Sequence, residues 1–165
     1  MMSTLIHSDT QPQSDTPPDR DFIRVGPSRI EGTGVFAKRQ IARGTRIVEY
    51  TGARRSVESL VTDIANGKSP GVYLMHLHDG MAIDGSVGGS DARFINHGCN
   101  PNCEVYVFSD RLYVYAMREI TEGEELTFDY GLRTPRGIAA QEGRAEDHPC
   151  NCGSADCRGT MLKQS

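Results

Sequence analysis

The sequence predicts one mainly β domain with a single short helix, and three observations support this fold class. Short apolar runs recur between turn-forming residues from Phe22 onward, which is typical of short strands. The 18 glycines and 8 prolines favour many turns over a large helical bundle. The 165 residues suffice for one core with short tails and leave little room for a second.

Seven apolar runs are expected to form short strands. They cover residues 35–37, 47–50, 72–75, 81–84, 105–108, 112–116 and 126–128. Two pairs of turn residues, Asp79-Gly80 and Ser109-Asp110, separate neighbouring runs and predict hairpins.

One segment carries a helical pattern, between Ser56 and Asn66. Ser56 is the expected N-cap, and Gly67 lies just beyond the expected end. The apolar residues follow the i, i+3 and i+4 spacing of an amphipathic helix, namely Val57, Leu60, Val61, Ile64 and Ala65. We expect this helix to pack beside the sheets.

The chain divides into four segments by composition. Residues 1–21 are rich in Ser, Thr, Asp, Gln and Pro, which predicts a disordered tail. Residues 22–132 form the folded domain. Residues 133–149 mix arginines and acids with few large apolar side chains, which predicts a flexible connection to a cysteine-rich segment at 150–161.

Charge and hydropathy exclude several classes of protein. The formal net charge of −4 disfavours direct binding to nucleic acid. No apolar run approaches the roughly 18 residues of a membrane helix, so no membrane partner is expected. The first 15 residues lack the basic start and apolar core of a secretory signal, so we expect no export by the general secretory route.

The cysteines indicate a metal site. Five cysteines without a signal peptide point to metal binding or catalysis rather than to a disulfide framework. Three thiols lie within eight positions, Cys150, Cys152 and Cys157, and can converge on one tetrahedral ion, for which zinc is the leading candidate. Sequence leaves three candidates for the fourth ligand, Cys99, Cys103 and His148. The alternative is a set of free surface thiols.

Three other motifs are ambiguous when taken singly. Residues 93–103 mix amide, imidazole and thiol groups, but the asparagines can simply build turns. Gly32 and Gly34 permit close approach to a ligand, although an ordinary β-turn is the alternative and the dinucleotide-binding pattern is missing. Residues 123–131 end a strand with Phe128 and Tyr130 on one face, either as core packing or with the tyrosine hydroxyl in a site.

Taken together and in order, these segments resemble the SET-domain family of S-adenosylmethionine-dependent protein lysine methyltransferases. The resemblance covers residues 22–161. It is carried by residues 30–37 (IEGTGVFA), 49–52 (EYTG), 93–102 (RFINHGCNPN) and 124–130 (EELTFDY), and by the three C-terminal cysteines of a post-SET segment.

The resemblance implies a fold of small sheets in which the chain around Asn96 and the chain ending at Tyr130 cross in a pseudoknot, an exception to the rule against threaded connections. It implies that S-adenosylmethionine contacts eight residues, namely Gly32, Thr33, Gly34, Tyr73, Arg93, Phe94, Asn96 and His97. His97 is then a cofactor-site residue and not a general base.

The resemblance also implies the catalytic residues. Tyr130 matches the catalytic tyrosine, Tyr50 an aromatic of the lysine channel, and Phe128 the position that tunes the product. Because a Phe lacks a hydroxyl that would hold an amine or water, we expect di- or trimethylation. The lysine must lose its proton first, which costs about 4 to 5 kcal/mol at pH 7 from a reference pKa near 10.4.

For the metal, the resemblance implies that Cys99 joins Cys150, Cys152 and Cys157 around a structural zinc ion. The ion then clamps the C-terminal segment over the lysine channel, so chelation should weaken activity. Cys103 becomes a spare buried thiol, and His148 takes no part.

Two departures from the family pattern stand out. Thr51-Gly52-Ala53 lacks the acid that commonly follows the glycine, and the usual Asn-His-Ser-Cys is Asn-His-Gly-Cys at 96–99. The insert at 54–91 is short, and such inserts shape the peptide groove in the family.

Three hypotheses follow for function. The first is an active methyltransferase for a basic protein or peptide such as a histone. The second is a catalytically inactive, zinc-stabilised module that binds a peptide or the cofactor. The third is an enzyme of the same fold acting on a ribosomal or DNA-packaging protein. The expected location is the bacterial cytoplasm or a nucleus, with delivery to a host by another secretion route left open.

Overall fold

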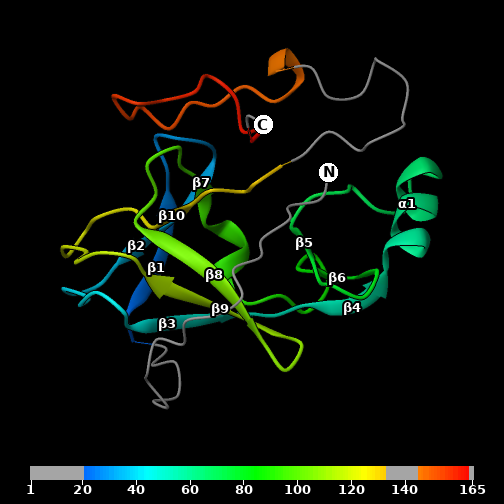
Figure 1. Cartoon of the computed structure of the whole chain (residues 1–165), viewed down its shortest axis with the longest axis horizontal. Helices are drawn as coiled ribbons and strands as arrows, with labels where there is room; N and C mark the ends of the chain where they lie inside the picture. Colours follow the sequence, from blue (N-terminus) through cyan, green and yellow to red (C-terminus); the bar gives the residue numbers. More distant parts are fainter. Residues whose placement is uncertain (1–20, 133–144, 164–165) are drawn as a thin grey trace.

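The computed structural model describes residues 21–132, here called the body, and residues 145–163, the C-terminal segment. The body contains four small sheets, as Figure 1 shows. The two-stranded sheets are β1 (Ile23–Pro27) with β2 (Thr33–Ala37), antiparallel, and β7 (Asn96–His97) with β10 (Thr127–Phe128), parallel. One three-stranded sheet has the strand order β3 (Arg46–Tyr50), β9 (Arg111–Ala116), β8 (Cys103–Phe108). The other has the order β4 (Ala53–Ser56), β6 (Met81–Asp84), β5 (Leu74–His76). The predicted mainly β class with several small sheets is confirmed.

One core draws residues from all four sheets. Its most deeply buried members include residues of β2, β3 and β9 and of the loops that follow β2 and β9, namely Val35, Ile41, Ile47, Leu112, Val114, Ile120 and Leu126. β9 is the central strand of its sheet, which explains why five of its six residues are buried.

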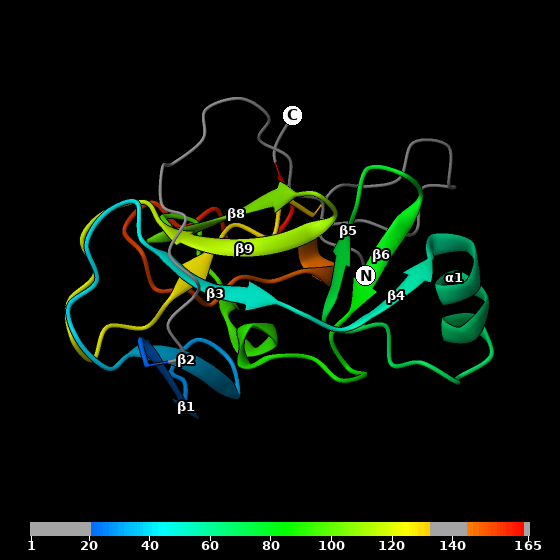
Figure 2. The same ribbon diagram turned by 90° about the horizontal axis from the view of Figure 1, so that it is seen from below.

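The predicted helix is confirmed as α1 (Val57–Ala65). The Ser56 side chain accepts a hydrogen bond from the Ser59 amide, and Gly67 follows the helix with φ of 68°. Leu60 packs against Leu74 and Ala82 in a small second cluster. Figure 2 shows α1 beside the β4–β6–β5 sheet at one end of the body, far from β1 and β2.

The predicted hairpins are confirmed, and two strands are shorter than expected. Ser109 and Asp110 both have positive φ between β8 and β9, as a two-residue hairpin turn requires. The expected strand at 72–75 begins only at Leu74, because Tyr73 has φ of 59° and cannot continue an extended chain. The expected strand at 126–128 is reduced to β10.

The C-terminal segment lies against the β7 and β10 end of the body (Figure 1). It contains η2 (Ala145–Asp147), and two isolated bridges tie it down, one within the segment between Pro149 and Thr160 and one to the body between Leu132 and Leu162. Residues 145–149, which composition assigned to the flexible connection, therefore include paired residues. The expected disorder of the N-terminal tail and the remainder of the connection, 133–144, fall outside the described residues.

A short 3-10 helix, η1 (Asp91–Phe94), precedes β7. None of the helices described is long and apolar enough to span a membrane.

Candidate active site and cysteine centre

A cavity lies where the insert, η1, β7, β10 and the C-terminal segment meet. Its volume is about 490 Å³, within the range of small-molecule sites. Nine of the predicted site residues line it, namely Gly32, Thr33, Tyr50, Tyr73, Arg93, Phe94, Asn96, Phe128 and Tyr130. Leu132 and Met161 are among the other residues that line it, and the sequence did not single out either of them.

Two predicted residues lie beside this cavity. His97 lines a smaller cavity of about 190 Å³, together with Asn96, Tyr130 and Cys150. Gly34 is buried in β2, where a Cβ atom would lie 2.3 Å from Oε1 of Glu125. The two cavities share Asn96 and Tyr130, so they form adjoining parts of one site.

The parallel pairing of β7 with β10 brings the two central motifs together. Asn96 pairs with Thr127 and His97 with Phe128, although about 30 residues of chain separate them. A Cβ atom at Gly98 would lie 2.6 Å from Thr127 Oγ1, so glycine allows this close approach. The departure from Asn-His-Ser-Cys therefore has a local reason in the packing.

Tyr130 lies just beyond β10, and hydrogen bonds from its backbone and from its hydroxyl hold it in place. Its backbone N–H donates to His97 Nδ1 at 3.1 Å, and its hydroxyl donates to the Ile95 carbonyl at 3.0 Å. Its ring lies 5.2 Å from the Phe128 ring, as the predicted common face requires. The phenol and Asn96 thus line the same cavity.

The Tyr130 amide also fixes the tautomer of His97. Because Nδ1 accepts that hydrogen bond, the ring proton lies on Nε2, which is 3.4 Å from Cys99 Sγ. Burial lowers the pKa of His97, which outweighs the opposing effect of the nearby Asp129 carboxylate. The neutral imidazole is therefore a structural link between Tyr130 and the cysteines.

Asn96 anchors the loop that contains Gly32. Its Nδ2 lies 3.1 Å from the carbonyl oxygens of Glu31 and Thr33 and 3.0 Å from Glu125 Oε1. Ser28 Oγ donates to the same Glu125 oxygen at 2.7 Å. Sequence reasoning missed Glu125 as a separate feature, and its only signal was its place in the 124–130 motif.

Tyr50 and Tyr73 form another part of the cavity wall. The Tyr50 hydroxyl donates to the Tyr73 carbonyl at 2.8 Å, and the Gly85 amide donates to the same oxygen at 2.9 Å. These two bonds hold Tyr73 in its unusual positive-φ conformation. The Tyr73 ring lies edge-on to Phe94, and the Arg93 guanidinium covers the Phe94 ring at 4.3 Å.

The two buried phenols are neutral near physiological pH. Burial raises the pKa of Tyr50 and of Tyr130 well above the usual value for a tyrosine. The cavity therefore offers aromatic faces and un-ionised hydroxyls, which suit the orientation of a cationic or uncharged reactant.

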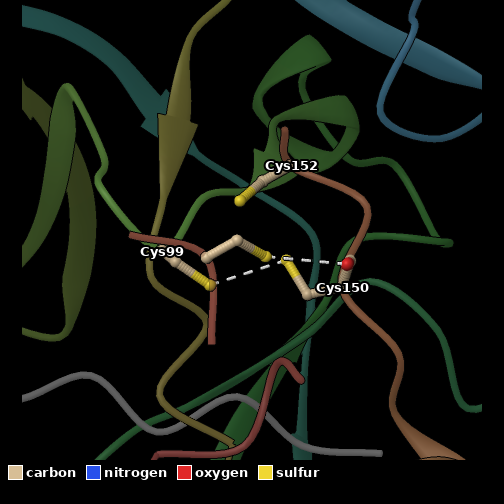
Figure 3. A group of neighbouring side chains, drawn as sticks. Cys99, Cys150 and Cys152 are labelled. Carbon is tan, nitrogen blue, oxygen red and sulfur yellow. Dashed lines mark hydrogen bonds between the residues drawn. The ribbon is translucent and has the colours of Figure 1, made fainter. Parts of the chain in front are cut away.

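Four sulfur atoms meet at the junction of the body and the C-terminal segment (Figure 3). The Sγ atoms of Cys99, Cys150, Cys152 and Cys157 all lie within 4.8 Å of one another, and those of Cys99 and Cys150 are 3.6 Å apart. A tetrahedral zinc ion with Zn–S bonds near 2.3 Å needs sulfur separations of about 3.8 Å. The four thiols therefore fit a structural zinc site.

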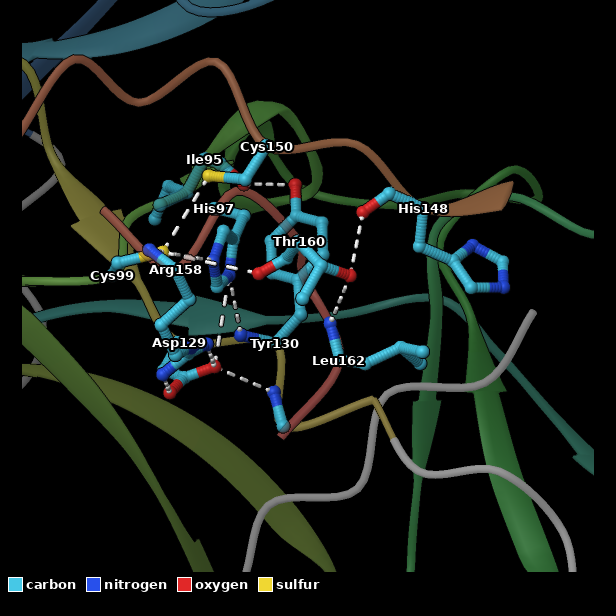
Figure 4. Close-up of polar contacts among 11 residues, drawn as sticks. Ile95, His97, Cys99, Asp129, Tyr130, His148, Cys150, Arg158, Thr160 and Leu162 are labelled. Carbon is cyan, nitrogen blue, oxygen red and sulfur yellow. Dashed lines mark hydrogen bonds and ion pairs between the residues drawn. The ribbon is translucent and has the colours of Figure 1, made fainter. Parts of the chain in front are cut away.

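The other two candidate ligands lie elsewhere. Cys103 is 1% exposed in the core of the body, where burial raises the pKa of its thiol. The His148 ring points away from the sulfur atoms (Figure 4). Of the three candidates that sequence left open, Cys99 is therefore the one that lies with the three C-terminal thiols.

Comparison with known proteins places this geometry in a family. The model of the SET domain matches residues 32–131. The human histone-lysine N-methyltransferase 2B is 35% identical over 147 residues, covering 84% of this chain and 5% of that protein. The histone-lysine N-methyltransferase ash1 of Drosophila melanogaster is 38% identical over 145 residues, covering 79% of this chain and 6% of that protein.

A solved structure agrees with these sequence relatives. The Polycomb Repressive Complex 2 of Chaetomium thermophilum, in an autoinhibited conformation bound to S-adenosylmethionine, matches with a TM-score of 0.59 and 30% identity. The match covers 68% of this chain and 15% of that chain. This chain spans about one twentieth of the length of the curated relatives named here. Its matched region and the motifs that meet at its cavity establish that the chain belongs to the SET domain family.

Proposed function

We propose that this chain transfers a methyl group from S-adenosylmethionine to the side-chain amine of a protein lysine. The observation that carries the proposal is the meeting of Tyr130, Asn96 and the Gly32 loop around one cavity of about 490 Å³. The relatives named histone-lysine N-methyltransferase, and the neighbour bound to S-adenosylmethionine, support the same reaction.

The cavity has the walls that the cofactor needs. The loop at Gly32 and Thr33 offers backbone atoms, and the side chain of Asn96 holds that loop in place. The rings of Tyr73 and Phe94 offer apolar faces. His97, in the adjoining cavity, supports the same pocket through Tyr130. When bound, S-adenosylmethionine supplies a methyl group on a positively charged sulfur.

Tyr130 orients the reacting atoms. The hydrogen bonds from its backbone N–H and its hydroxyl fix the position of the phenol in the cavity wall, beside Asn96. The amine of an incoming lysine therefore meets the phenol in a fixed position. Tyr50 and Phe128 line the lysine channel beside it. Holding nitrogen, methyl carbon and sulfur nearly in line lowers the entropic part of the barrier.

The lysine must arrive at the methyl group as a neutral amine. Because the raised pKa values of Tyr50 and Tyr130 keep both phenols protonated, neither serves as the base. A channel walled by buried aromatic rings disfavours the charged ammonium, as does the nearby sulfonium. The proton then leaves to water in the channel.

Phe128 sets the degree of methylation. Its ring is 2% exposed and lies 5.2 Å from the Tyr130 ring, without a hydroxyl that would hold the amine in one orientation. A partly methylated amine can therefore rotate and react again, giving di- or trimethylation. Intact-mass analysis of a methylated peptide tests this, and exclusive monomethylation would contradict it.

Zinc has a structural role in the proposal. Cys99, Cys150, Cys152 and Cys157 would hold it, and its position ties the C-terminal segment, with Met161, to the cavity wall. Zinc supplies rigidity there and takes no part in the reaction.

The substrate we propose is a basic protein or peptide, with a histone as the first choice because the relatives are histone-lysine methyltransferases. A ribosomal or DNA-packaging protein is the second. The net charge of −4 favours a basic partner over nucleic acid. A nuclear site of action follows from the first choice and a bacterial cytoplasmic one from the second.

The decisive experiment incubates the protein with labelled S-adenosylmethionine and with separate panels of histones and basic bacterial proteins. Mass spectrometry locates each modified lysine. Label on a lysine of either panel, absent in Tyr130→Phe, supports the proposal and selects the substrate class. Calorimetric binding of the cofactor with no label in any panel would favour the inactive binding module.

A further inference from the structure

Arg158 joins the C-terminal segment to the chain that carries Tyr130, and no motif in the sequence pointed to it. Its Nη1 donates to Asp129 Oδ2 at 2.8 Å and its Nη2 to Asp129 Oδ1 at 3.0 Å. The two side chains are 22% and 28% exposed, so this two-pronged pair is largely shielded from water. Such pairs are stronger and more specific in geometry than exposed single contacts.

The Asp129 carboxylate holds the backbone around Tyr130. Its Oδ1 also accepts from the Gly131 amide at 2.9 Å, so one side chain ties the residues that precede and follow the tyrosine. Tyr130 itself donates from its backbone to His97 (Figure 4). A shift of Asp129 would therefore move the phenol relative to the cavity.

The other end of Arg158 faces the cysteine centre. Its backbone N–H donates to Cys99 Sγ at 3.4 Å, and Cys157 is its chain neighbour. Its Nε is buried and, within the described residues, has no hydrogen-bond partner. Burial of a guanidinium costs free energy unless a negative charge lies nearby. Four thiolates around one divalent zinc ion would carry a net negative charge, which would offset this cost for Arg158.

We propose that Arg158 is a positioning residue that couples closure of the C-terminal segment to the placement of Tyr130, acting through Asp129. The inference rests on the proposed function, in which Tyr130 orients the reacting atoms. Cys99 and the three C-terminal cysteines would hold the segment against the body when they bind zinc, and the Arg158–Asp129 pair transmits the position of the segment to the tyrosine. Loss of the pair should misplace the phenol even when zinc is bound.

The test uses the full, zinc-loaded chain with Arg158→Met, which removes the charge and keeps an apolar stem. We expect turnover at saturating peptide and cofactor to fall roughly 10- to 100-fold, as a small misplacement of a reacting group does. The zinc content and the Kd for S-adenosylmethionine should both stay within about twofold of the values for the unmodified protein. A tenfold change in Kd would correspond to about 1.4 kcal/mol. Hydrogen exchange of the Tyr130 and Gly131 amides should become faster.

Two comparisons isolate the pair. Asp129→Asn should have the same effects, and the double variant should be no slower than Arg158→Met, because the two residues act as one unit. Arg55→Met is the matched control. It breaks an Arg–Asp pair of similar exposure, 27% and 25%, beside α1. It should leave exchange at 130 and 131 unchanged.

Three results would overturn the inference. They are unchanged exchange at 130 and 131 in Arg158→Met, loss of zinc from that variant, and additive losses of turnover in the double variant. If the unmodified protein methylates no substrate, the proposed function fails, while hydrogen exchange and zinc content still decide whether Arg158 controls the Tyr130 backbone.

Discussion

The body and the C-terminal segment are stabilised by different physical forces. All of the buried hydrophobic residues in the described chain lie in the body, between Val35 and Leu132. In the C-terminal segment the buried residues are two polar ones, His148 and Thr160. The body therefore folds around an apolar core, whereas the segment depends on thiols, one ion pair and a few backbone hydrogen bonds.

Because of this difference, the body and the C-terminal segment have separate roles, the body in the proposed reaction and the segment in closing the site. The body contributes the phenol, the amide and the glycine loop of the candidate active site, while the segment contributes one wall through Met161. A short segment without an apolar core does little to offset the entropy of its own ordering, and the proposed zinc site would supply the missing stabilisation. Each prediction below tests one side of this division.

The largest expected effect comes from Tyr130→Phe in the body. Removing the hydroxyl that bonds the Ile95 carbonyl should reduce turnover by roughly 1,000-fold, which corresponds to about 4 kcal/mol in the barrier. The Kd for S-adenosylmethionine should change little, because the cofactor walls remain. Single-turnover kinetics and calorimetry measure the two quantities, and normal turnover would reject the role of Tyr130.

The next prediction concerns the core of the body. Leu126→Ala removes a fully buried side chain and should lower the free energy of unfolding by about 2 to 5 kcal/mol. The matched change in the segment, Leu162→Ala, alters a partly exposed residue and should cost less than about 1 kcal/mol. Urea unfolding measures the free energy of unfolding of both variants. Equal losses would contradict the conclusion that the apolar core stabilises the body and not the C-terminal segment.

Removal of the metal should act on closure alone. A chelator, or Cys157→Ala, should release the C-terminal segment and lower turnover by roughly 10- to 100-fold. The unfolding midpoint of the body should stay nearly constant, because its core contains none of the four ligands. Cys103→Ser is not a suitable control because that thiol lies in the core. Collapse of the whole protein on chelation would show that the body also depends on the metal.

The smallest expected effect is a loss of stability in acid. Burial raises the pKa of Glu124, but hydrogen bonds from Arg118, Asn102 and Thr121 outweigh it and lower the pKa to about 2. A carboxylate whose pKa is lower in the folded state stabilises the protein above its ordinary value of 4.5, and that contribution is lost as the pH falls toward 2.

Because the Arg118 side chain is 55% exposed and solvent screens its pairing with Glu124, which is itself 25% exposed, we expect this contribution to be only about 1 kcal/mol. Glu124→Gln should flatten the pH dependence of unfolding between pH 4.5 and 2. Chelated protein should be used, so that the change reports on the body alone. An unchanged pH profile would show that the hydrogen bonds of Glu124 do not contribute.

Local signals in the sequence predicted much of the fold. The apolar spacing and the caps of α1 fixed its bounds to within a residue, since both depend only on near neighbours in the chain. The Ser109-Asp110 turn likewise predicted the β8–β9 hairpin. By contrast, the truncation of β5 came from the positive φ of Tyr73, which hydrogen bonds from Tyr50 and Gly85 impose from a distance.

By itself, the sequence determined the mainly β class, the helix, the family and the residue types of the candidate site, because these follow from periodicity and motifs along the chain. Only the tertiary structure showed that Cys99, and not Cys103, lies with the three C-terminal thiols, since this depends on which thiol is buried in the core. The tertiary structure alone also showed the contacts of Glu125 with Asn96 and of Arg158 with Asp129. Both contacts form between residues 29 positions apart in the chain, and no local pattern encodes such a meeting.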